Sequence, residues 1–268
     1  MVKIITIDLD GTLFDSMKKI SDENKRAIKL AREQGIKIVI ATGRPFNGVK
    51  PVLDELNINS EDDYVICYNG AKCFNVKTKE LVASSTITGK EVKEIFRESK
   101  RLNTYFHAFR QNEELIAHQK NEYTDVETRI NDITETIMDI DTIKDEDLFL
   151  KAMMVASDER LNSAMTIIDE YFYTKFSMVR SARIFLEFLN KKTDKGLALV
   201  ELANYLGIDM KDTMAIGDAG NDLSMIEKAG IGVCMRNGFE YVKAKANYIT
   251  DNDNNESGVA EAIRRYAL

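Results

Sequence analysis

The sequence predicts an α/β protein with a parallel sheet and an inserted α+β domain, and three observations carry this prediction. Apolar strand segments alternate with helical segments over residues 1–83, and the alternation returns over residues 191–268. Residues 84–190 between them have a different, strand-rich pattern. Because alternating strands and helices are typical of right-handed βαβ units, we expect 1–83 and 191–268 to build one core and 84–190 to form the insert.

The first part of the core is predicted as strand, helix, strand, helix and strand. A helix follows the strand VKIITID, begins after Ser21 and stops at Gly35, since serine accepts hydrogen bonds at a helix start and glycine ends helices. IKIVIATG is the second strand and YVICYNG the third. Pro45 opens the helix between them, where its missing N–H costs nothing.

The insert begins with a capping box, Thr88 to Glu91, in front of a helix. Its strands are predicted at 104–107, 114–117, 148–155, 175–180 and 184–189, with helices near 121–130 and 158–170. The core then resumes with helices over 196–206, 221–229 and 259–266, and with strands at TMAIGD, IGVCM and 248–250.

Composition argues against several classes of protein. Lys and Arg number 37 against 44 Asp and Glu, a formal charge of −7 that disfavours nucleic-acid binding. No apolar run reaches ~18 residues, and two aspartates occupy the place of a signal peptide's apolar segment. Three cysteines and two histidines provide neither a disulfide framework nor much material for a zinc site. We therefore expect a cytoplasmic protein without nucleic-acid or membrane partners, whose chemistry uses carboxylates and lysine.

Polar residues follow four predicted buried strands at the point where each strand ends. They are Asp8, Thr42, Asn69 and Asp218, each with a glycine beside it or soon after. A single polar residue can simply begin a loop. However, ligands of parallel α/β sheets bind beyond the carboxyl ends of the strands, so four such ends predict one shared site.

Two motifs at these strand ends are rich in carboxylates. Asp8-Leu-Asp10-Gly-Thr follows the first strand, and residues i and i+2 of an extended chain point to the same side. Gly217-Asp218-Ala-Gly-Asn221-Asp222 stands at a strand-to-helix junction, where Asp222 could also favour the helix start. A bare DxD is weak evidence, since Asp139-Ile-Asp141 also occurs in the insert.

Four aspartates in one crevice would repel each other and raise one another's pKa values. The site is therefore expected to require cations, and oxygen ligands of this kind suit Mg²⁺. Mg²⁺ and Lys195 would offset most of the charge, so that a phosphate dianion is expected to bind only with the metal. Lys195 begins a predicted helix, where a cation opposes the helix dipole, and this location points to a functional role.

The motifs together resemble those of the haloacid dehalogenase superfamily of phosphatases. They read here as Asp8-Leu-Asp10-Gly-Thr, Ala41-Thr42-Gly43-Arg44, Lys195-Gly196 and Gly217-Asp218-Ala-Gly-Asn221-Asp222, and the match extends over essentially the whole chain. The insert resembles the C2B cap of the Cof-type subfamily IIB. Segments such as CYNGA, KAMMV and FLEFLNKKTDKG are similar to those of sugar phosphatases in that branch.

This resemblance implies a Mg²⁺-dependent phosphatase of small phosphorylated metabolites, sugar phosphates foremost, with an aspartyl-phosphate intermediate. It implies Asp8 as the nucleophile and Asp10 as the general acid and base. It also implies that Asp8, the backbone carbonyl of Asp10 and Asp218 bind Mg²⁺.

The remaining motif residues are implied to handle the phosphoryl group. Thr42, the Gly43 amide and Lys195 would bind the oxygens of the transferring group, and Asn221 would touch phosphate. Asp222 would orient Lys195 or a metal-bound water.

Two other functions stay open at this point, a phosphoryl-transfer mutase and a non-catalytic phosphometabolite sensor. The pair Asp8 and Asp10 disfavours the sensor, which has no need of a nucleophile and an acid. Four insert residues match positions in the segments that resemble sugar phosphatases: Lys151, Arg180, Ser181 and Glu187. Lys151 and Glu187 could equally be a structural pair. The motifs do not identify the metabolite, and they do not distinguish a monomer from a homodimer.

Overall fold

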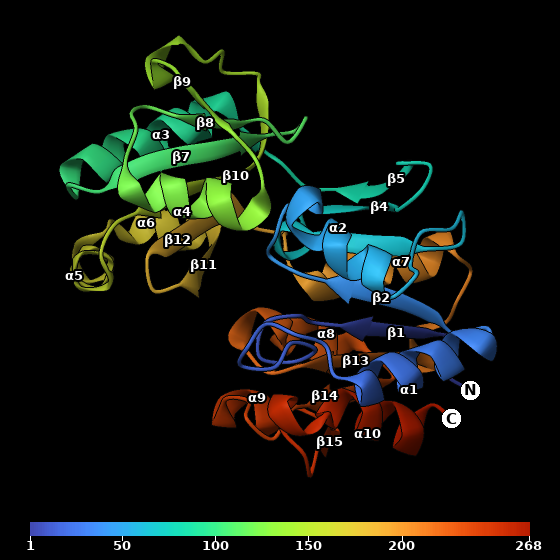
Figure 1. The fold of residues 1–268 in the computed structure, drawn as a ribbon. Coiled ribbons are helices and arrows are strands. Elements are labelled where there is room, and N and C mark those ends of the chain that lie inside the picture. The colour runs from blue at the N-terminus through green and yellow to red at the C-terminus, as the bar shows by residue number, and fades with distance from the viewer. The chain divides into compact units, whose positions relative to one another are not determined.

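The computed structural model describes all 268 residues, which separate into two units (Figure 1). The core unit contains Met1–Gly43, Lys50–Ser84 and Asp194–Leu268, and the insert unit contains Arg44–Val49 and Ser85–Thr193. The segment Arg44–Val49 thus groups with the insert unit, whereas the sequence placed it in the core.

An eight-stranded sheet forms the centre of the core unit. Its strands are β1 (Ile4–Ile7), β2 (Lys37–Ala41), β3 (Tyr64–Cys67), β4 (Lys72–Asn75), β5 (Leu81–Ser84), β13 (Thr213–Gly217), β14 (Ile231–Cys234) and β15 (Tyr248–Ile249). Their order is β15-β14-β13-β1-β2-β3-β4-β5. The strands from β15 to β3 run parallel, and β4 and β5 are antiparallel additions at one edge.

Helices cover this sheet on both faces. They are α1 (Asp22–Glu33), α2 (Phe46–Glu55), α7 (Lys195–Tyr205), α8 (Leu223–Lys228), α9 (Glu240–Lys243) and α10 (Gly258–Tyr266). Leu199 and Leu202 of α7 and Met225 of α8 pack on apolar residues of the central strands, while α1 and α10 contact each other. Ser21 accepts a hydrogen bond from the Asn24 amide at 3.2 Å, as expected of the cap of α1.

The direction of strand addition reverses at β1. From β1 the chain proceeds to β2 and β3 on one side, and it later returns as β13 and β14 on the other side. Such a switch point leaves a crevice beyond the carboxyl ends of the two central strands. Because β1 ends at Ile7 and β13 at Gly217, Asp8 and Asp218 directly follow the strands that flank the crevice.

The insert unit is built on a second, largely antiparallel sheet. Its strands are β6 (Ile87–Thr88), β7 (Tyr105–Arg110), β8 (Leu115–Ala117), β9 (Glu135–Ile137), β10 (Leu148–Val155), β11 (Phe176–Ala182) and β12 (Phe185–Asn190). Its helices are α3 (Gly89–Arg101), α4 (Glu122–Asn131), α5 (Asp158–Ile167) and α6 (Glu170–Lys175). The strand order is β11-β12-β10-β7-β8-β9, with β6 paired to β10.

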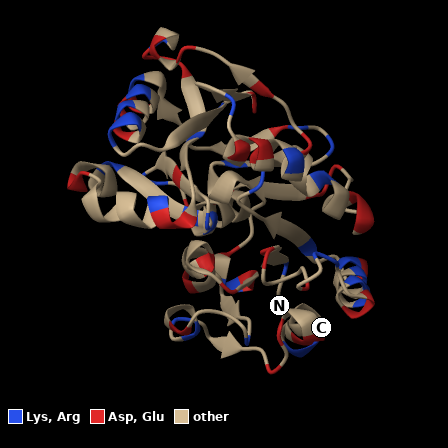
Figure 2. Ribbon diagram, turned by 60° about the vertical axis from the view of Figure 1, so that its left-hand side comes forward, with Lys and Arg blue, Asp and Glu red and all other residues tan.

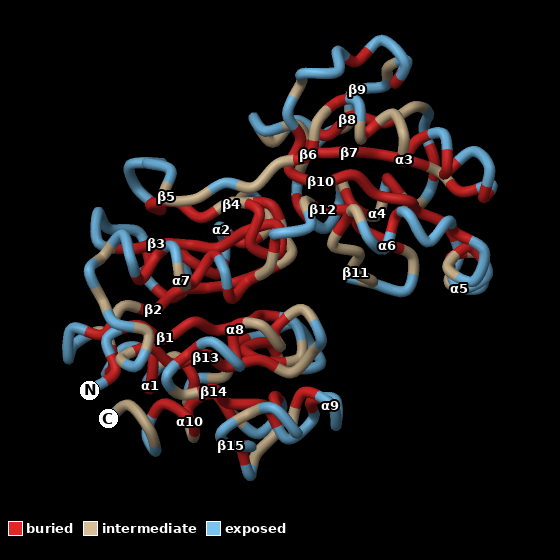
Figure 3. Tube along the Cα trace, turned by 180° about the vertical axis from the view of Figure 1, so that it is seen from behind, coloured by how far each residue is buried: buried red, intermediate tan, exposed pale blue.

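The two faces of the insert sheet differ in character. One face packs against α3, α5 and α6 through an apolar core that includes Phe96, Phe106 and Phe172. Side chains alternate along a strand, so Lys151 and Met153 of β10 occupy the other face, where α4 packs. The central strands, such as β1 and β13 of the core unit and β10 and β12 of the insert unit, are buried over most of their length (Figure 3). Charged residues of both signs are mixed over the two units (Figure 2).

Several elements differ from the sequence prediction. The short strands β4, β5 and β9 and the four-residue helix α9 were not predicted, because their apolar residues are too few to establish a period. The helix expected over 158–170 ends at Ile167 as α5, and a separate helix, α6, begins at Glu170 with Asp169 as its cap. No helix of the structure combines the length and apolar character that crossing a membrane requires.

Candidate active site

The loop after β1 places its two aspartates in different surroundings. Asp8 is buried, and its backbone N–H donates to the Ile216 carbonyl of β13 at 3.0 Å. The side chain of Asp10 is 44% exposed and forms a 2.6 Å ion pair with Lys18. One carboxylate is therefore buried, while the other is accessible to solvent.

Lys195 connects two of the buried carboxylates, Asp8 and Asp222. It is the first residue of α7, it is fully buried, and its ammonium lies 2.5 Å from Asp8 Oδ1 and 2.7 Å from Asp222 Oδ1. The structure thus supplies the reason for a lysine at a helix start, since two carboxylates compensate for the unfavourable helix dipole.

Asp222 is hydrogen-bonded through both carboxylate oxygens. Oδ1 accepts from Lys195, and Oδ2 accepts from the backbone amides of Asp218 and Ala219 at 3.0 Å each. The neighbouring Asp218 accepts a hydrogen bond from the Thr12 hydroxyl at 2.8 Å, which joins the loops after β1 and β13. Asp222 is therefore held as a fixed acceptor for Lys195.

Burial and repulsion make this group of carboxylates costly without a further cation. Burial, and next the charge of Asp222, raise the pKa of Asp8 well above its ordinary value, although Lys195 opposes the shift. Burial and Asp222 raise the pKa of Asp218 to about 6. Burial disfavours the ammonium of Lys195, but Asp222 and Asp8 outweigh this effect and raise its pKa.

The carboxylates could hold a metal ion. Oxygens of Asp8, Asp218 and Asp222 lie within 4.8 Å of one another. Such a donor set suits a hard divalent cation, whose charge would relieve the repulsion within the group. Since Asp222 already bonds Lys195 and two amides, Asp8 and Asp218 are the better placed ligands.

The ends of β2 and β3 contribute a second, neutral group of side chains. The backbone N–H of Asn69 donates to the Thr42 carbonyl at 2.9 Å, and the side-chain Nδ2 of Asn221 donates to Asn69 Oδ1 at 3.1 Å. A Cβ on Gly43 would stand 3.0 Å from Asn69 Nδ2. Thr42, Gly43 and Asn221, predicted separately from sequence, thus gather around Asn69.

Sequence reasoning did not assign a role to three residues that organise the site. Asn69 has a φ of +55°, a left-handed conformation that asparagine tolerates better than most residues. Thr12 bonds Asp218, and Asn237 Nδ2 donates to the Gly11 carbonyl at 2.7 Å. Asn237 follows β14, so it could have been found from the sequence as a polar residue after a fifth parallel strand.

The four insert residues singled out from sequence do not form one group. Lys151 is 2.8 Å from Glu187 Oε1, and the Ser181 hydroxyl donates to the same oxygen at 2.7 Å. Arg180 instead pairs with Asp158 at 2.8 Å, on the neighbouring helix α5.

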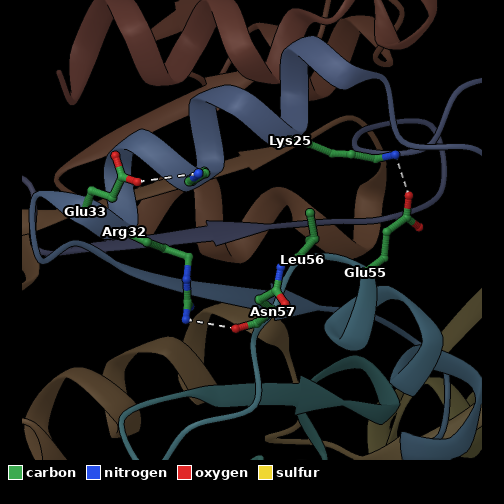
Figure 4. A pocket seen from close by; sticks show the side chains of 7 residues that line it. Lys25, Arg32, Glu33, Glu55, Leu56 and Asn57 are labelled. Atoms are coloured by element: carbon green, nitrogen blue, oxygen red, sulfur yellow. Dashed lines mark hydrogen bonds and ion pairs between the residues drawn. The ribbon is translucent and has the colours of Figure 1, made fainter.

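Another pocket of the core unit, of about 390 Å³, lies between α1 and the end of α2 (Figure 4). Lys25 pairs there with Glu55 at 2.6 Å, and Arg32 donates to the Asn57 carbonyl at 3.1 Å and pairs with Asp63 at 2.6 Å. Because its cations are matched by carboxylates, this pocket has little surplus charge to attract a phosphate.

We expect Gly11→Ala to damage the site more than a glycine substitution elsewhere. Gly11 has a φ of +88°, and a Cβ there would stand 2.5 Å from Asp218 Oδ2. Gly35→Ala is the matched control, because Gly35 has a φ of +83° but nothing within 4 Å of the added carbon. Gly11→Ala should lower the free energy of unfolding in urea by about 1–3 kcal/mol more than Gly35→Ala. Equal losses in the two variants would contradict the collision with Asp218.

Comparison with known proteins places this site in a family. Residues 5–263 match the family of haloacid dehalogenase-like hydrolases. A Bacillus subtilis protein named "Putative phosphatase YxeH" is 39% identical over 269 residues, which cover 100% of this chain and 99% of that protein. The 5-amino-6-(5-phospho-D-ribitylamino)uracil phosphatase YcsE of the same organism is 31% identical, with 100% of this chain and 96% of that protein covered.

Solved structures agree with this placement. A haloacid dehalogenase-like hydrolase from Bacteroides thetaiotaomicron has a TM-score of 0.86 at 32% identity, covering 99% of each chain. The subclass IIB sugar phosphatase BT4131 has a TM-score of 0.79 at 26% identity, covering 98% of each chain. The chain therefore belongs to the haloacid dehalogenase-like hydrolases and, within them, to the phosphatases, which hydrolyse phosphoric monoesters.

Proposed function

We propose that this protein is a Mg²⁺-dependent phosphatase of small polyhydroxylated phosphate esters, sugar phosphates foremost, and that it forms an aspartyl-phosphate on Asp8. The observation that carries the proposal is the contact between Asp8 and buried Lys195 at the switch point of the sheet, with Asp218 and Asp222 beside it. This arrangement supports a nucleophile next to a fixed cation and a place for a metal.

The metal would be held by Asp8, Asp218 and the backbone carbonyl of Asp10. When bound, Mg²⁺ would supply positive charge that polarises a phosphate oxygen and offsets the repulsion among the carboxylates. Burial and Asp222 raise the pKa of Asp8, and the charge of Lys195 opposes that shift, so Lys195 favours the ionised, nucleophilic form of the carboxylate.

Hydrolysis would proceed in two displacements at phosphorus. A carboxylate oxygen of Asp8 attacks the phosphorus, the bond to the leaving oxygen breaks, and Asp10 gives that oxygen a proton. Water then attacks the aspartyl-phosphate while Asp10 takes the proton, which releases phosphate and restores Asp8. Exposure of Asp10 to solvent supports the second step, in which this residue takes a proton from the attacking water.

The neutral group around Asn69 would bind the transferring phosphoryl oxygens. We assign this to the Thr42 hydroxyl, the Gly43 amide and Asn221, together with the ammonium of Lys195. Asp222 orients Lys195, in keeping with its three hydrogen bonds.

The substrate class rests on what similar proteins are named for. BT4131 is a sugar phosphatase, and YcsE acts on a phosphoribityl compound; both names describe a phosphate ester on a polyhydroxylated chain. The insert unit would act as a cap that shields the reaction from bulk solvent. We propose a cytoplasmic setting, in keeping with the sparse and odd number of cysteines in the sequence, with the protein acting as a monomer or a homodimer.

The test is phosphate release from a panel of phosphorylated metabolites with Mg²⁺ or with chelator. The panel should include hexose and pentose phosphates, a phosphoribityl compound, nucleotides and a generic aryl phosphate. We expect sugar phosphates to rank first and to require the metal. Isomerised sugar phosphate without free phosphate would replace hydrolysis by mutase activity, and tight binding without either product would indicate a sensor.

Metal binding should depend on pH because Mg²⁺ competes with a proton on Asp218. The pKa of Asp218 is raised from 3.8 to about 6. Between these two pH values the folded chain keeps a proton on Asp218 that the unfolded chain has lost. In the metal-free protein, the stability associated with Asp218 therefore falls as pH rises from about 4 towards 6. We expect Mg²⁺ to raise the Tm more at pH 7.5 than at pH 5, measured by differential scanning calorimetry. A Tm increment that is the same at both pH values would exclude Asp218 as a ligand.

A further inference from the structure

The insert unit contains a buried charged cluster, Lys151, Glu187 and Glu127, on the sheet face that α4 covers. The three residues are 1%, 2% and 3% exposed. Lys151 bonds Glu187 at 2.8 Å but lies 3.9 Å from Glu127 Oε1, beyond hydrogen-bond range. Glu187 has a second partner in the Ser181 hydroxyl. The ammonium of Lys151 thus faces two carboxylates, and its electrostatic interaction with Glu127 is the weaker of the two because the distance is longer.

A buried carboxylate needs compensation, and for Glu127 a second cation is Arg44. Burial raises the pKa of Glu127, and Lys151 and Arg44 are the cations that counter this effect. Arg44 belongs to the segment Arg44–Val49, which groups with the insert unit. Charge within this unit therefore favours a close approach of that segment to α4.

Close packing between Gly48 and Asn131 also shows that the segment Arg44–Val49 lies next to α4. A Cβ added to Gly48 would collide with Asn131 Oδ1 and stand 3.5 Å from Arg44 Cβ. Asn131 lies one helical turn after Glu127, on the same face of α4, and it is 2% exposed. The absence of a side chain at Gly48 is what allows α4 to lie this close to Arg44–Val49.

Arg44 is covalently linked to Gly43, and Thr42 precedes both. We propose that Glu127 is a positioning residue, which acts through Arg44 to hold the turn that carries Thr42 and Gly43. The inference rests on the proposed function, in which these two residues bind the phosphoryl group. Glu127 itself touches no substrate in this account.

The proposal is tested with Glu127→Gln, which keeps the shape of the side chain and removes its charge. The variant should fold, since the Lys151 and Glu187 charges still balance, and thermal unfolding checks this. Glu122→Gln is the matched control, at an exposed glutamate on the same helix. Readouts are kcat and KM for an aryl phosphate, the Mg²⁺ concentration for half-activation, and inorganic phosphate affinity by calorimetry with Mg²⁺ present.

We expect Glu127→Gln to lower kcat/KM and phosphate affinity about tenfold each, with half-activation by Mg²⁺ within about twofold of wild type. Arg44→Gln should reproduce this loss, and the double variant should lose no more than the worse single variant. Glu122→Gln should match wild type.

Folded Glu127→Gln with wild-type kcat/KM and phosphate affinity would overturn the proposal. So would losses that multiply in the double variant, because Arg44 and Glu127 would then act independently. Should Glu127→Gln not fold, Arg44→Gln tests the same charge interaction from its partly exposed side, and unchanged phosphate affinity in that variant would equally overturn the proposal. Phosphate binding needs no turnover, so an inactive wild type would count against the proposed function and leave this test intact.

Discussion

Asp8→Asn is expected to lower kcat for phosphate-ester hydrolysis by about a thousandfold or more. An amide oxygen is a poor nucleophile, so no aspartyl-phosphate can form, although the side chain keeps its size. The variant should not be less stable than wild type in chelator at neutral pH. Burial and Asp222 raise the pKa of Asp8, which means that the ionised carboxylate costs folding energy that an uncharged side chain avoids.

The matched control for this variant is Asp141→Asn. Asp141 is an exposed aspartate of the second DxD in the chain, Asp139-Ile-Asp141, and lies in the insert unit. Its substitution should leave turnover unchanged. The measurement is phosphate release with Mg²⁺ on the best substrate of the panel, alongside urea unfolding. If Asp8→Asn keeps more than a few per cent of wild-type turnover, the covalent mechanism is wrong.

Lys195→Met is expected to affect both stability and activity. The lysine is fully buried between Asp8 and Asp222, and its loss leaves two buried carboxylates without their cation. Breaking a buried ion pair in this way costs about 3–5 kcal/mol. Loss of a fixed cation from the proposed phosphoryl-binding site should in addition lower kcat about a hundredfold or more.

The stability deficit of Lys195→Met should depend on pH in a definite direction. The unpaired carboxylates can take up protons at low pH, so urea unfolding should show a larger deficit at pH 8 than at pH 5. Lys195 in the wild type stays charged over this range, since its pKa is raised. Lys192→Met, at an exposed lysine three residues earlier, should show no deficit at either pH. A pH-independent deficit would mean that lost packing, and not uncompensated charge, destabilises the variant.

The local sequence was sufficient to predict most of the core and to group residues that lie together beyond the ends of its central strands. Strand and helix periods are properties of a few consecutive residues, which is why β1, β2, β3 and β13 were predicted close to their observed bounds. Parallel strands place their carboxyl ends on one edge, so the residues that follow them could be grouped before any distance was known. Lys195 stood out because a cation at a helix start is unfavourable unless something compensates it.

Other features depend on which segments meet in space, and the tertiary structure alone decided them. Lys195 and Asp8 are 187 residues apart, and only the strand order makes them an ion pair. Asp8 and Asp10 share a motif, but packing buries one and exposes the other. The central place of Asn69 depends on a hydrogen bond from Asn221, and the cluster around Lys151 on the contact of α4 with β10 and β12. A local pattern records which face of an element is apolar, whereas burial, charge compensation and pKa depend on what lies across that face.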